Sequence, residues 1–496
     1  MLPLRIQLER DGQFSTVAKK SRDAALGALA NSAPFDMILR RLKTSRSNGI
    51  HPLFQVAVNC QNGTDILQAT ALGRGIDMAI TRDGTLIDRI DKVAVAQQDC
   101  AAVKDDNGRS LTYGQLMART RQIANQLRTY SVSPSSRVAM LLDPIADAVC
   151  CILALVRLAL VWIPLDTRKH HQSLDAIMSE RRPAVLIGQH ATEKQAQILV
   201  AGRAPVLMNI EAASVLDDSA VVNVSKPPLT AAILYTSGST GAPKGVLLMH
   251  GGLMNSISVT TMSLGMGREI TLQQSSLGFD LLLDQVFLAL ANEGTIIMVG
   301  KEGRGGSLHI TQLVVKERVT LTHFVPLEYL TLPNYGQHIL KHGQSWRFAL
   351  GLVPYHADED ILGSRDYLRP SPNYSMEIRD QQMNIVPVGF PGETCISGPS
   401  TALGFLNRPE ETKQKFVEVD VGFDPDSDDN ARRRTKAYRS GDFGRILPDG
   451  TLQVLGRLDG DSQVKVRGIR VELGEIANVI VDASNGAIRN AAVSLR

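Results

Sequence analysis

The sequence predicts an α/β protein built on parallel sheets, followed by a β-rich segment. Short apolar runs suited to buried strands alternate with helical patterns over residues 110–190, and this order is typical of a parallel sheet. The chain has 496 residues, of which 44% are hydrophobic and 21% are charged, so it is long enough for more than one folded core. A glycine-rich β pattern then occupies residues 386–408.

The N-terminal part of the chain differs in pattern from the rest. We expect an amphipathic helix at residues 23–42 and a strand at residues 53–58. Residues 71–100 contain GRG and RDG turns and are interpreted as a polar linker. The main domain is therefore expected to begin at residue 101, and residues 1–70 to form a separate packing module.

Strands and helices alternate at the start of the main domain. A tyrosine-containing strand leads into a helix in which Leu116, Ile123 and Leu127 fall near helical spacing. Strands are expected at RVAMLL (137–142), VWIPLD (161–166) and PAVLI (183–187), with a buried helix at 146–160.

The composition argues against nucleic-acid and membrane partners. Lys+Arg 53 against Asp+Glu 50 gives a net charge of +3, which is too balanced for a polyanion partner. The most apolar run carries Arg157 at its centre, so it is expected to be a buried helix rather than a membrane span. The N-terminus has charges where a signal peptide needs an apolar core, and the five cysteines lack metal-ligand spacing. We therefore expect a cytoplasmic protein.

A polar, glycine-punctuated segment lies between two apolar runs at residues 231–250, AAILYTSGSTGAPKGVLLMH. The flanking runs suit buried strands, so the segment between them is expected to be a loop joining two strands. Glycines permit close backbone approach, hydroxyls donate hydrogen bonds, and a lysine adds a cation, which together favour a polyphosphate ligand. The candidate phosphate-binding residues are Thr236, Ser237, Gly238, Ser239, Thr240, Gly241 and Lys244.

Two other interpretations of this loop are weaker. A P-loop needs glycine before its lysine, a hydroxyl residue after it, and then a helix, but here Pro243 precedes Lys244, Gly245 follows it, and a strand pattern comes next. A surface turn does not require so many hydroxyls, glycines and a lysine within ten residues. Phosphate binding is therefore the preferred interpretation.

YTSGSTGAPKGV resembles the ATP-phosphate loop of adenylate-forming enzymes, and specifically that of the amino-acid-activating adenylation domains of nonribosomal peptide synthetases and polyketide-peptide hybrids. Residues 438–476 are similar to the same family almost end to end. Residues 1–70 resemble the last part of a condensation domain, although the H-H-x-x-x-D-G motif of that family is absent. The resemblance implies an acyl-CoA synthetase-like large domain at 101–458 and a small α+β subdomain that begins at 459.

The resemblance also implies roles for particular residues. Asp280 corresponds to an aspartate that binds the α-ammonium group of the substrate; the alternative interpretation is a helix N-cap, and Asp280 could serve as both. Asp442, after a turn at Ser440 and Gly441, corresponds to the ribose-binding aspartate, whose two oxygens can accept from both hydroxyls. Further implied residues are Leu281, Asp284 and Phe324 in the substrate pocket, Arg457 at the nucleotide, and Asp459 at the hinge between subdomains.

The sequence departs from the family pattern in two places. The segment that holds adenine, and whose glutamate helps to bind magnesium, is degraded around residues 351–373. The chain ends at Arg496, before the family's catalytic lysine and before a carrier domain with its phosphopantetheine. We therefore assign no catalytic residue and no metal ligand. Residues 459–496 are expected to form a truncated subdomain, and the chain is expected to have weak or no turnover.

The implied reaction uses ATP and Mg²⁺ to activate an amino acid as aminoacyl-AMP. The aminoacyl group would then form a thioester on a peptidyl carrier domain, as in secondary-metabolite biosynthesis. Two alternatives remain open: an acyl-CoA or aryl-acid ligase, which Asp280 opposes, and a non-catalytic module that keeps the adenylation fold.

Overall fold

The computed structural model describes residues 84–169, 171–212, 219–236, 244–324, 347–350, 353–356, 367–368, 370, 373–423, 432–458, 463–466 and 469–472, with a few single positions beyond 475. The chain divides into two compact units, 1–63 and 64–496, and every described residue belongs to the second. The elements expected at 23–42 and 53–58, and the condensation-like segment 1–70, lie outside the described residues.

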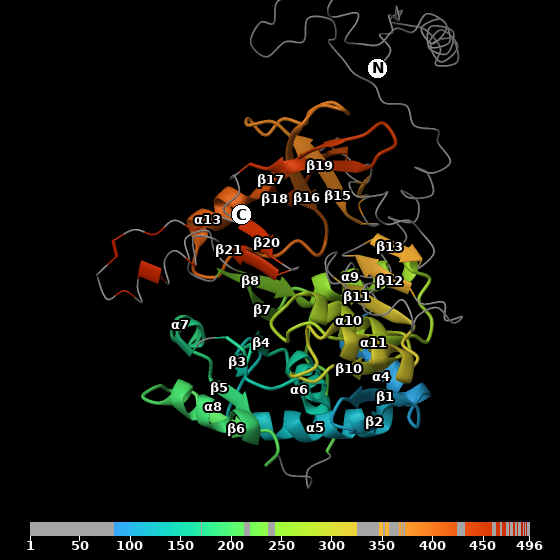
Figure 1. Ribbon diagram of the computed structural model, residues 1–496, viewed down its shortest axis with the longest axis vertical. Coiled ribbons are helices and arrows are strands. Elements are labelled where there is room, and N and C mark those ends of the chain that lie inside the picture. Colours follow the sequence, from blue (N-terminus) through green and yellow to red (C-terminus); the bar gives the residue numbers. More distant parts are fainter. Residues whose placement is uncertain are drawn as a thin grey trace, which may run out of the picture. The chain divides into compact units, whose positions relative to one another are not determined.

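The first sheet has six strands in the order β6-β5-β3-β4-β7-β8 (Figure 1). Neighbouring strands from β6 to β7 are parallel, and β7 and β8 form an antiparallel pair at one edge. The three strands expected at RVAMLL, VWIPLD and PAVLI are confirmed as β3, β4 and β5. The strands are β3 Arg137–Met140, β4 Val161–Pro164, β5 Val185–Gly188, β6 Val206–Asn209, β7 Thr230–Thr236 and β8 Lys244–Met249.

The second sheet has seven strands in the order β13-β12-β11-β9-β10-β1-β2. Its inner strands are parallel, whereas β2 and β13 are antiparallel at the two edges. These two sheets confirm the predicted α/β class. The strands are β1 Ala101–Asp105, β2 Ser110–Thr112, β9 Ile270–Gln273, β10 Thr295–Met298, β11 Leu321–Phe324, β12 Arg347–Leu350 and β13 Val353–His356.

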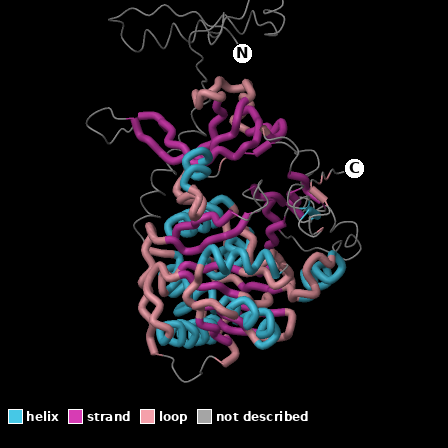
Figure 2. The backbone as a smooth tube through the Cα atoms, turned by 90° about the vertical axis from the view of Figure 1, so that its left-hand side faces the viewer, coloured by secondary structure: helices cyan, strands magenta, loops and turns pink. Residues whose placement is uncertain are grey.

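Helices cover the strands of both sheets, as the alternation of cyan and magenta shows in Figure 2. Helix α6, Ala146–Arg157, contacts β4 of the first sheet and β1 of the second, so it belongs to the layer between them. Every residue of α6 is buried, which explains why its sequence is apolar on all sides. The other helices are α4 Leu86–Ala96, α5 Tyr113–Thr129, α7 His171–Arg181, α8 Glu193–Val200, α9 His250–Ser263, α10 Leu281–Ala291, α11 Ser307–Lys316 and α13 Pro409–Lys415.

The prediction of a polar linker at 71–100 is wrong for its described part, because residues 84–100 contain helix α4. Its buried residues Leu86, Ile87 and Ile90 belong to the main core. Asp91 on the same helix forms an ion pair with Arg157, whose Nη1 also donates to the Val221 carbonyl at 3.2 Å. The arginine within the apolar run is therefore a buried, paired side chain.

A third sheet is antiparallel throughout and has the order β14-β19-β18-β16-β15, with β17 paired to β18. A separate two-stranded hairpin, β20 and β21, follows it. The bounds are β14 Tyr367–Leu368, β15 Ser375–Arg379, β16 Gly392–Ser397, β17 Phe416–Phe423, β18 Arg432–Ile446, β19 Leu452–Arg457, β20 Gln463–Val466 and β21 Ile469–Glu472.

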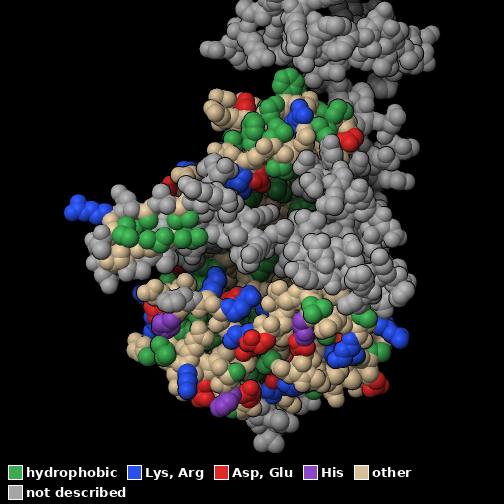
Figure 3. Space-filling model, viewed as in Figure 1, with side chains coloured by type: hydrophobic (Ala, Val, Ile, Leu, Met, Phe, Trp, Pro, Cys, Tyr) green, Lys and Arg blue, Asp and Glu red, His purple; other side chains and the backbone are tan. Residues whose placement is uncertain are grey.

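Two surface properties bear on partners. Among the described helices, none combines the length and apolar character needed to cross a bilayer. Basic and acidic side chains are interspersed over the described surface of the two-sheet region in Figure 3, as the net charge of +3 predicts.

Candidate functional site

The ends of the candidate phosphate loop belong to the antiparallel pair β7 and β8. Thr236, the last residue of β7, lies directly opposite Lys244, the first residue of β8. The predicted strand on each side of the loop is therefore confirmed, and the strand after Lys244 is incompatible with a P-loop, in which a helix follows. Residues 237–243, which carry most of the candidate hydroxyls and glycines, lie outside the described residues.

Lys244 contacts side chains from the third-sheet region. Its Nζ lies 2.9 Å from Oε2 of Glu411 on α13 and 5.8 Å from the centroid of the Phe405 ring. Burial would raise the pKa of Glu411, but hydrogen bonds from Lys244 and Arg408 outweigh it and hold that pKa below its ordinary value. The candidate phosphate cation is thus paired with an ionised carboxylate.

A chain of aromatic rings runs from Lys244 toward the candidate ribose-binding strand. The Phe405 ring lies 5.4 Å from that of Phe416, and the Phe416 ring lies 5.0 Å from that of Tyr438 on β18. Asp442 is four residues further along the same strand, a span of roughly 13 Å in an extended chain. Side-chain contacts therefore connect the end of the phosphate loop to β18, the strand that carries Asp442.

Asp442 and Arg457 are cross-strand neighbours on β18 and β19. Arg457 Nη1 donates to Asp442 Oδ1 at 2.9 Å, and both side chains are about one-third exposed, at 32% and 38%. The expected turn at Ser440 and Gly441 is instead an irregularity within β18: the register to β16 shifts here and Gly441 has a φ of +77°. The Ser440 hydroxyl accepts from the Asp442 amide at 3.0 Å, which fixes the backbone that carries the carboxylate.

Asp280 lies at the start of α10, directly after the loop that follows β9. Its carboxylate is exposed and accepts a hydrogen bond from the Leu281 amide at 3.0 Å. The capping interpretation of Asp280 is therefore confirmed, and binding of an ammonium group stays a prediction. Leu281 is half-buried on the same turn.

Asp284 lies one turn after Asp280 and is the most strongly perturbed carboxyl group of this region. Burial, together with the negative charge of Asp280, raises the pKa of Asp284 to about 7. Its Oδ2 lies 3.9 Å from Nδ1 of His323 on β11, whose pKa burial lowers to about 4. A carboxyl group and a neutral imidazole therefore face each other where the substrate pocket is predicted.

His323 was not singled out from the sequence, which points instead to the next residue, Phe324, the last residue of β11. The His323 side chain is 1% exposed, and neither of its ring nitrogens has a hydrogen-bond partner among the described residues. Its backbone carbonyl accepts from Gln285 Nε2 at 3.0 Å, which ties β11 to α10. The available signal was a histidine within a short strand, LTHF, and this does not distinguish a core histidine from a ligand-facing one. Asp459, the predicted hinge, lies outside the described residues.

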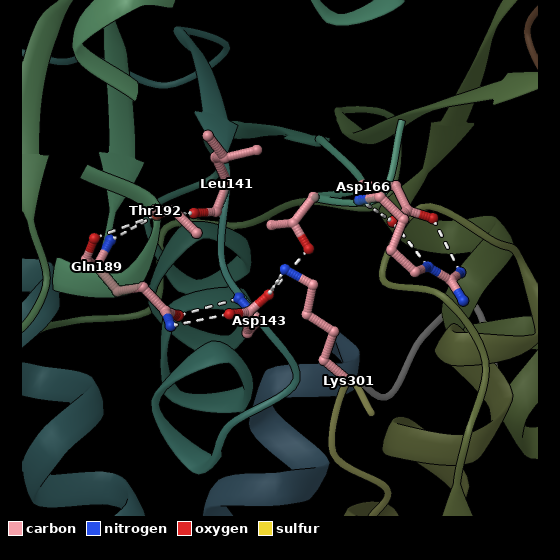
Figure 4. A network of polar contacts seen from close by, with 8 residues as sticks. Leu141, Asp143, Asp166, Gln189, Thr192 and Lys301 are labelled. Atoms are coloured by element: carbon pink, nitrogen blue, oxygen red, sulfur yellow. Dashed lines mark hydrogen bonds and ion pairs between the residues drawn. The ribbon is translucent and has the colours of Figure 1, made fainter. Parts of the chain in front are cut away.

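A network of polar side chains joins the two parallel sheets at the carboxyl ends of their strands (Figure 4). Asp143, after β3, accepts from the Gln189 side chain and the Thr167 hydroxyl and lies 3.5 Å from Lys301 Nζ, which follows β10. Asp166, after β4, accepts from Arg168 and from the Ser276 hydroxyl. These residues were not predicted from the sequence because their contacts depend on how the two sheets meet. Ligands of open parallel sheets bind at this edge.

Comparison with known proteins identifies the class. Residues 90–357, more than half of the chain, match the family model of the AMP-binding enzymes. The chain therefore belongs to the AMP-binding enzyme family, and the predicted adenylate-forming fold is confirmed.

Its relatives include several fungal hybrid polyketide-nonribosomal peptide synthetases. The hybrid PKS-NRPS synthetase pydA of Acremonium sp. is 30% identical over 626 aligned positions, which cover 100% of this chain and 15% of pydA. The synthetase apdA of Emericella nidulans is 31% identical over 624 positions, with 100% and 16% covered. The synthetase psoA of Aspergillus fumigatus is 34% identical, with 89% and 12% covered. The chain thus spans less than a fifth of each of these relatives.

Solved structures share the fold. An artificially fused adenylation-PCP di-domain, NpsA-ThdA, from Klebsiella oxytoca has a TM-score of 0.66 at 20% identity, covering 80% of this chain and 83% of that one. The four-domain nonribosomal peptide synthetase AB3403, solved with AMP and glycine, has a TM-score of 0.62 at 22% identity, covering 80% and 30%. At these identities the likeness supports the fold alone.

Proposed function

We propose that this chain is the adenylation domain of a hybrid polyketide-nonribosomal peptide synthetase and activates an amino acid with ATP. The observation that carries the proposal is the family match over residues 90–357, because that span contains both the candidate phosphate loop and the helix that begins after Asp280. In the reaction, a carboxylate oxygen of the amino acid attacks the α-phosphorus of ATP, and the bond from that phosphorus to the bridging oxygen of pyrophosphate breaks. Aminoacyl-AMP and pyrophosphate are the products.

The proposed roles of the residues are mainly positioning and charge stabilisation. Asp442 accepts from the ribose hydroxyls beside Arg457, while Asp280 pairs with the α-ammonium group. Leu281, Asp284 and Phe324 line the side-chain pocket, and Asp459 is the hinge. The β- and γ-phosphates are held by Thr236, Ser237, Gly238, Ser239, Thr240, Gly241 and Lys244.

Lys244 must exchange a partner when the triphosphate binds. In the structure its Nζ lies 2.9 Å from Oε2 of Glu411. The two side chains are only partly exposed, at 17% for Lys244 and 31% for Glu411. A polyphosphate carries more negative charge than one carboxylate, so the lysine is expected to move from Glu411 to the phosphates. Mg²⁺ is proposed to enter with the triphosphate, as part of the substrate Mg-ATP.

A peptidyl carrier domain is the proposed partner, either as a separate protein or in a longer polypeptide that includes this chain. Its phosphopantetheine thiol would take the aminoacyl group from AMP as a thioester. The NpsA-ThdA fusion, which joins an adenylation domain to a PCP, supports this pairing. The domain boundaries at 70 and 458, the condensation-like segment and the cytoplasmic location remain predictions.

Weak nucleotide binding is also part of the proposal. The alignment to pydA has 626 positions for 496 residues of this chain, so about 130 positions of that relative (626 − 496) have no counterpart here. The proposal keeps the prediction that the adenine-holding segment near 351–373 is reduced. Loss of one preorganised contact to a transition state typically lowers a rate about 100-fold or more, so slow turnover is expected.

Amino-acid-dependent exchange of pyrophosphate into ATP tests the proposal. The chain is assayed with each of the twenty amino acids and, as a matched panel, with aryl and fatty acids. Exchange with an amino acid supports the proposal, and exchange with only the second panel supports the acyl-CoA or aryl-acid ligase. A non-catalytic module is indicated if Mg-ATP gives neither calorimetric heat nor a thermal shift.

A further inference from the structure

The two halves of the proposed active site belong to different sheets. The ends of the phosphate loop, Thr236 and Lys244, lie on β7 and β8 of the first sheet. Asp280 follows β9 of the second sheet and begins α10. The distance between the bound amine and the bound phosphates therefore depends on the contacts that join the two sheets at this edge.

Asp166 forms such a contact. It follows β4, the strand that pairs with β7 through Trp162 and Ala232, so it lies one strand away from the phosphate loop. Its Oδ2 accepts from the hydroxyl of Ser276, a residue of the second sheet's β9–α10 loop, at 2.5 Å. Its side chain is only 13% exposed, which shields the contact from competing water.

Arg168 holds the Asp166 carboxylate in this orientation. The arginine donates through Nε at 3.2 Å and through Nη2 at 3.0 Å, and its backbone amide donates at 3.0 Å. Burial would raise the pKa of Asp166, but hydrogen bonds from Arg168 and Ser276 lower it to about 2. The carboxylate is therefore ionised at any pH at which the enzyme would be assayed.

Hydrogen bonds within the turn after Ser276 connect the position of Ser276 to that of Asp280. The Gly278 amide donates to the Ser276 hydroxyl at 3.3 Å, and the Phe279 amide donates to the Ser276 carbonyl at 3.0 Å. The Leu283 amide then donates to the Asp280 carbonyl at 2.9 Å. The segment from Ser276 to Asp280 is thus a hydrogen-bonded turn that leads directly into α10.

We propose that Asp166 is a positioning residue for the adenylation reaction: by holding Ser276, it sets the place of Asp280 relative to the phosphate loop. The inference rests on the proposed function, because Asp280 must bind the amine for its position to matter. A displacement of about 1 Å at such a site typically lowers catalytic efficiency about 100-fold. Asp166 touches neither substrate and acts only through Ser276.

Lys301 provides a matched control. It also joins the two sheets at this edge, through Asp143 at 3.5 Å, with its side chain 40% exposed. It follows β10 rather than β9, and its contact with Asp143 does not involve the turn that leads to Asp280. Lys301→Met therefore removes a cross-sheet contact without releasing Ser276.

Binding of aminoacyl sulfamoyladenosines tests the proposal without requiring turnover. The full chain is titrated with AMP and with twenty such analogues, one for each amino acid. The ratio of the dissociation constant of AMP to that of the tightest-binding analogue is compared among variants. Asp166→Ala and Ser276→Ala are expected to reduce the preference for the analogue over AMP about 10- to 100-fold, with AMP affinity changed less than about 2-fold. Their double variant should be no worse than either single one, and Asp166→Asn, which keeps an acceptor for Ser276, should recover part of the preference.

Different outcomes overturn different steps. If the unsubstituted chain binds no analogue more tightly than AMP, the proposed function fails and the positioning role with it. If the unsubstituted chain prefers an analogue, but Asp166→Ala keeps that preference or weakens AMP equally, Asp166 is not a positioning residue. An equal loss in Lys301→Met would show that general cross-sheet stability is responsible.

Discussion

Replacing Asp284 by asparagine removes a carboxyl group while nearly preserving its shape. In the folded chain, burial and the charge of Asp280 raise the pKa of Asp284 from 3.8 to about 7. A folded-state pKa above the unfolded value means that the folded protein binds the proton more tightly. The resulting stabilisation is fully present below pH 4 and is lost as the pH rises through about 7. The asparagine variant has no such loss.

The size of the effect follows from the two pKa values. Their difference, at about 1.4 kcal/mol per pKa unit, corresponds to about 4 kcal/mol as an upper limit. The Asp284 side chain is 17% exposed, so solvent reduces this figure, and we expect about 2 kcal/mol. Asp284→Asn should therefore raise the midpoint of thermal unfolding by about 2–5 °C at pH 8, with a much smaller change at pH 4.5.

Thermal unfolding of the two proteins at both pH values measures this difference. Asp280→Asn is the comparison variant. Asparagine keeps the cap at the helix start, and loss of this exposed charge removes only the smaller cause of the raised Asp284 pKa, so at pH 8 its midpoint should rise less than that of Asp284→Asn. An equal midpoint shift at pH 4.5 and pH 8, or no stabilisation of the Asp284 variant at pH 8, would show that the buried-charge explanation is wrong.

Three further substitutions test other parts of the structure. Glu411→Gln releases Lys244 from its ion pair and should tighten Mg-ATP binding about 2- to 5-fold in calorimetry, whereas a weaker affinity would show that Glu411 orients the lysine productively. Asp442→Asn should weaken Mg-ATP about 10-fold or more, because charged hydrogen bonds are lost, and its thermal midpoint should stay constant since the side chain is 38% exposed. Leu153→Ala in α6, where the side chain is fully buried, should lower the free energy of unfolding by about 2–5 kcal/mol; a smaller loss in denaturant unfolding would argue against a packed layer between the sheets.

The inner strands of the first sheet could be predicted because parallel strands buried on both faces appear as continuous apolar runs. β3, β4 and β5 fit this description at RVAM, VWIP and VLIG. Helix α4 was missed because its sequence, LIDRIDKVAVA, comes soon after the GRG and RDG turn motifs, and residues 71–100 were interpreted together as one linker. Its start did carry a signal, a capping box in which the Asp88 carboxylate accepts from the Thr85 amide at 2.6 Å.

Only those parts of the candidate site whose residues lie within one short segment of the sequence could be predicted. The two strands flanking the phosphate loop and the cap at Asp280 are local features, and both are observed. The contacts of His323 with Asp284, and of Asp166 with Ser276, join residues 39 and 110 positions apart (323 − 284 and 276 − 166). Such pairs depend on sheet order and helix packing, which one sequence does not specify.

The recognition of an amino group can be measured directly by titrating the unsubstituted chain with aminoacyl sulfamoyladenosines and with matching analogues that lack only the α-amine. A charged hydrogen bond to Asp280 is worth about 1.5–3 kcal/mol, so the amine should tighten binding about 10- to 100-fold, and Asp280→Asn should abolish the difference. Equal affinity for the two analogues in the unsubstituted chain would contradict the assignment of this protein as an amino-acid-activating domain.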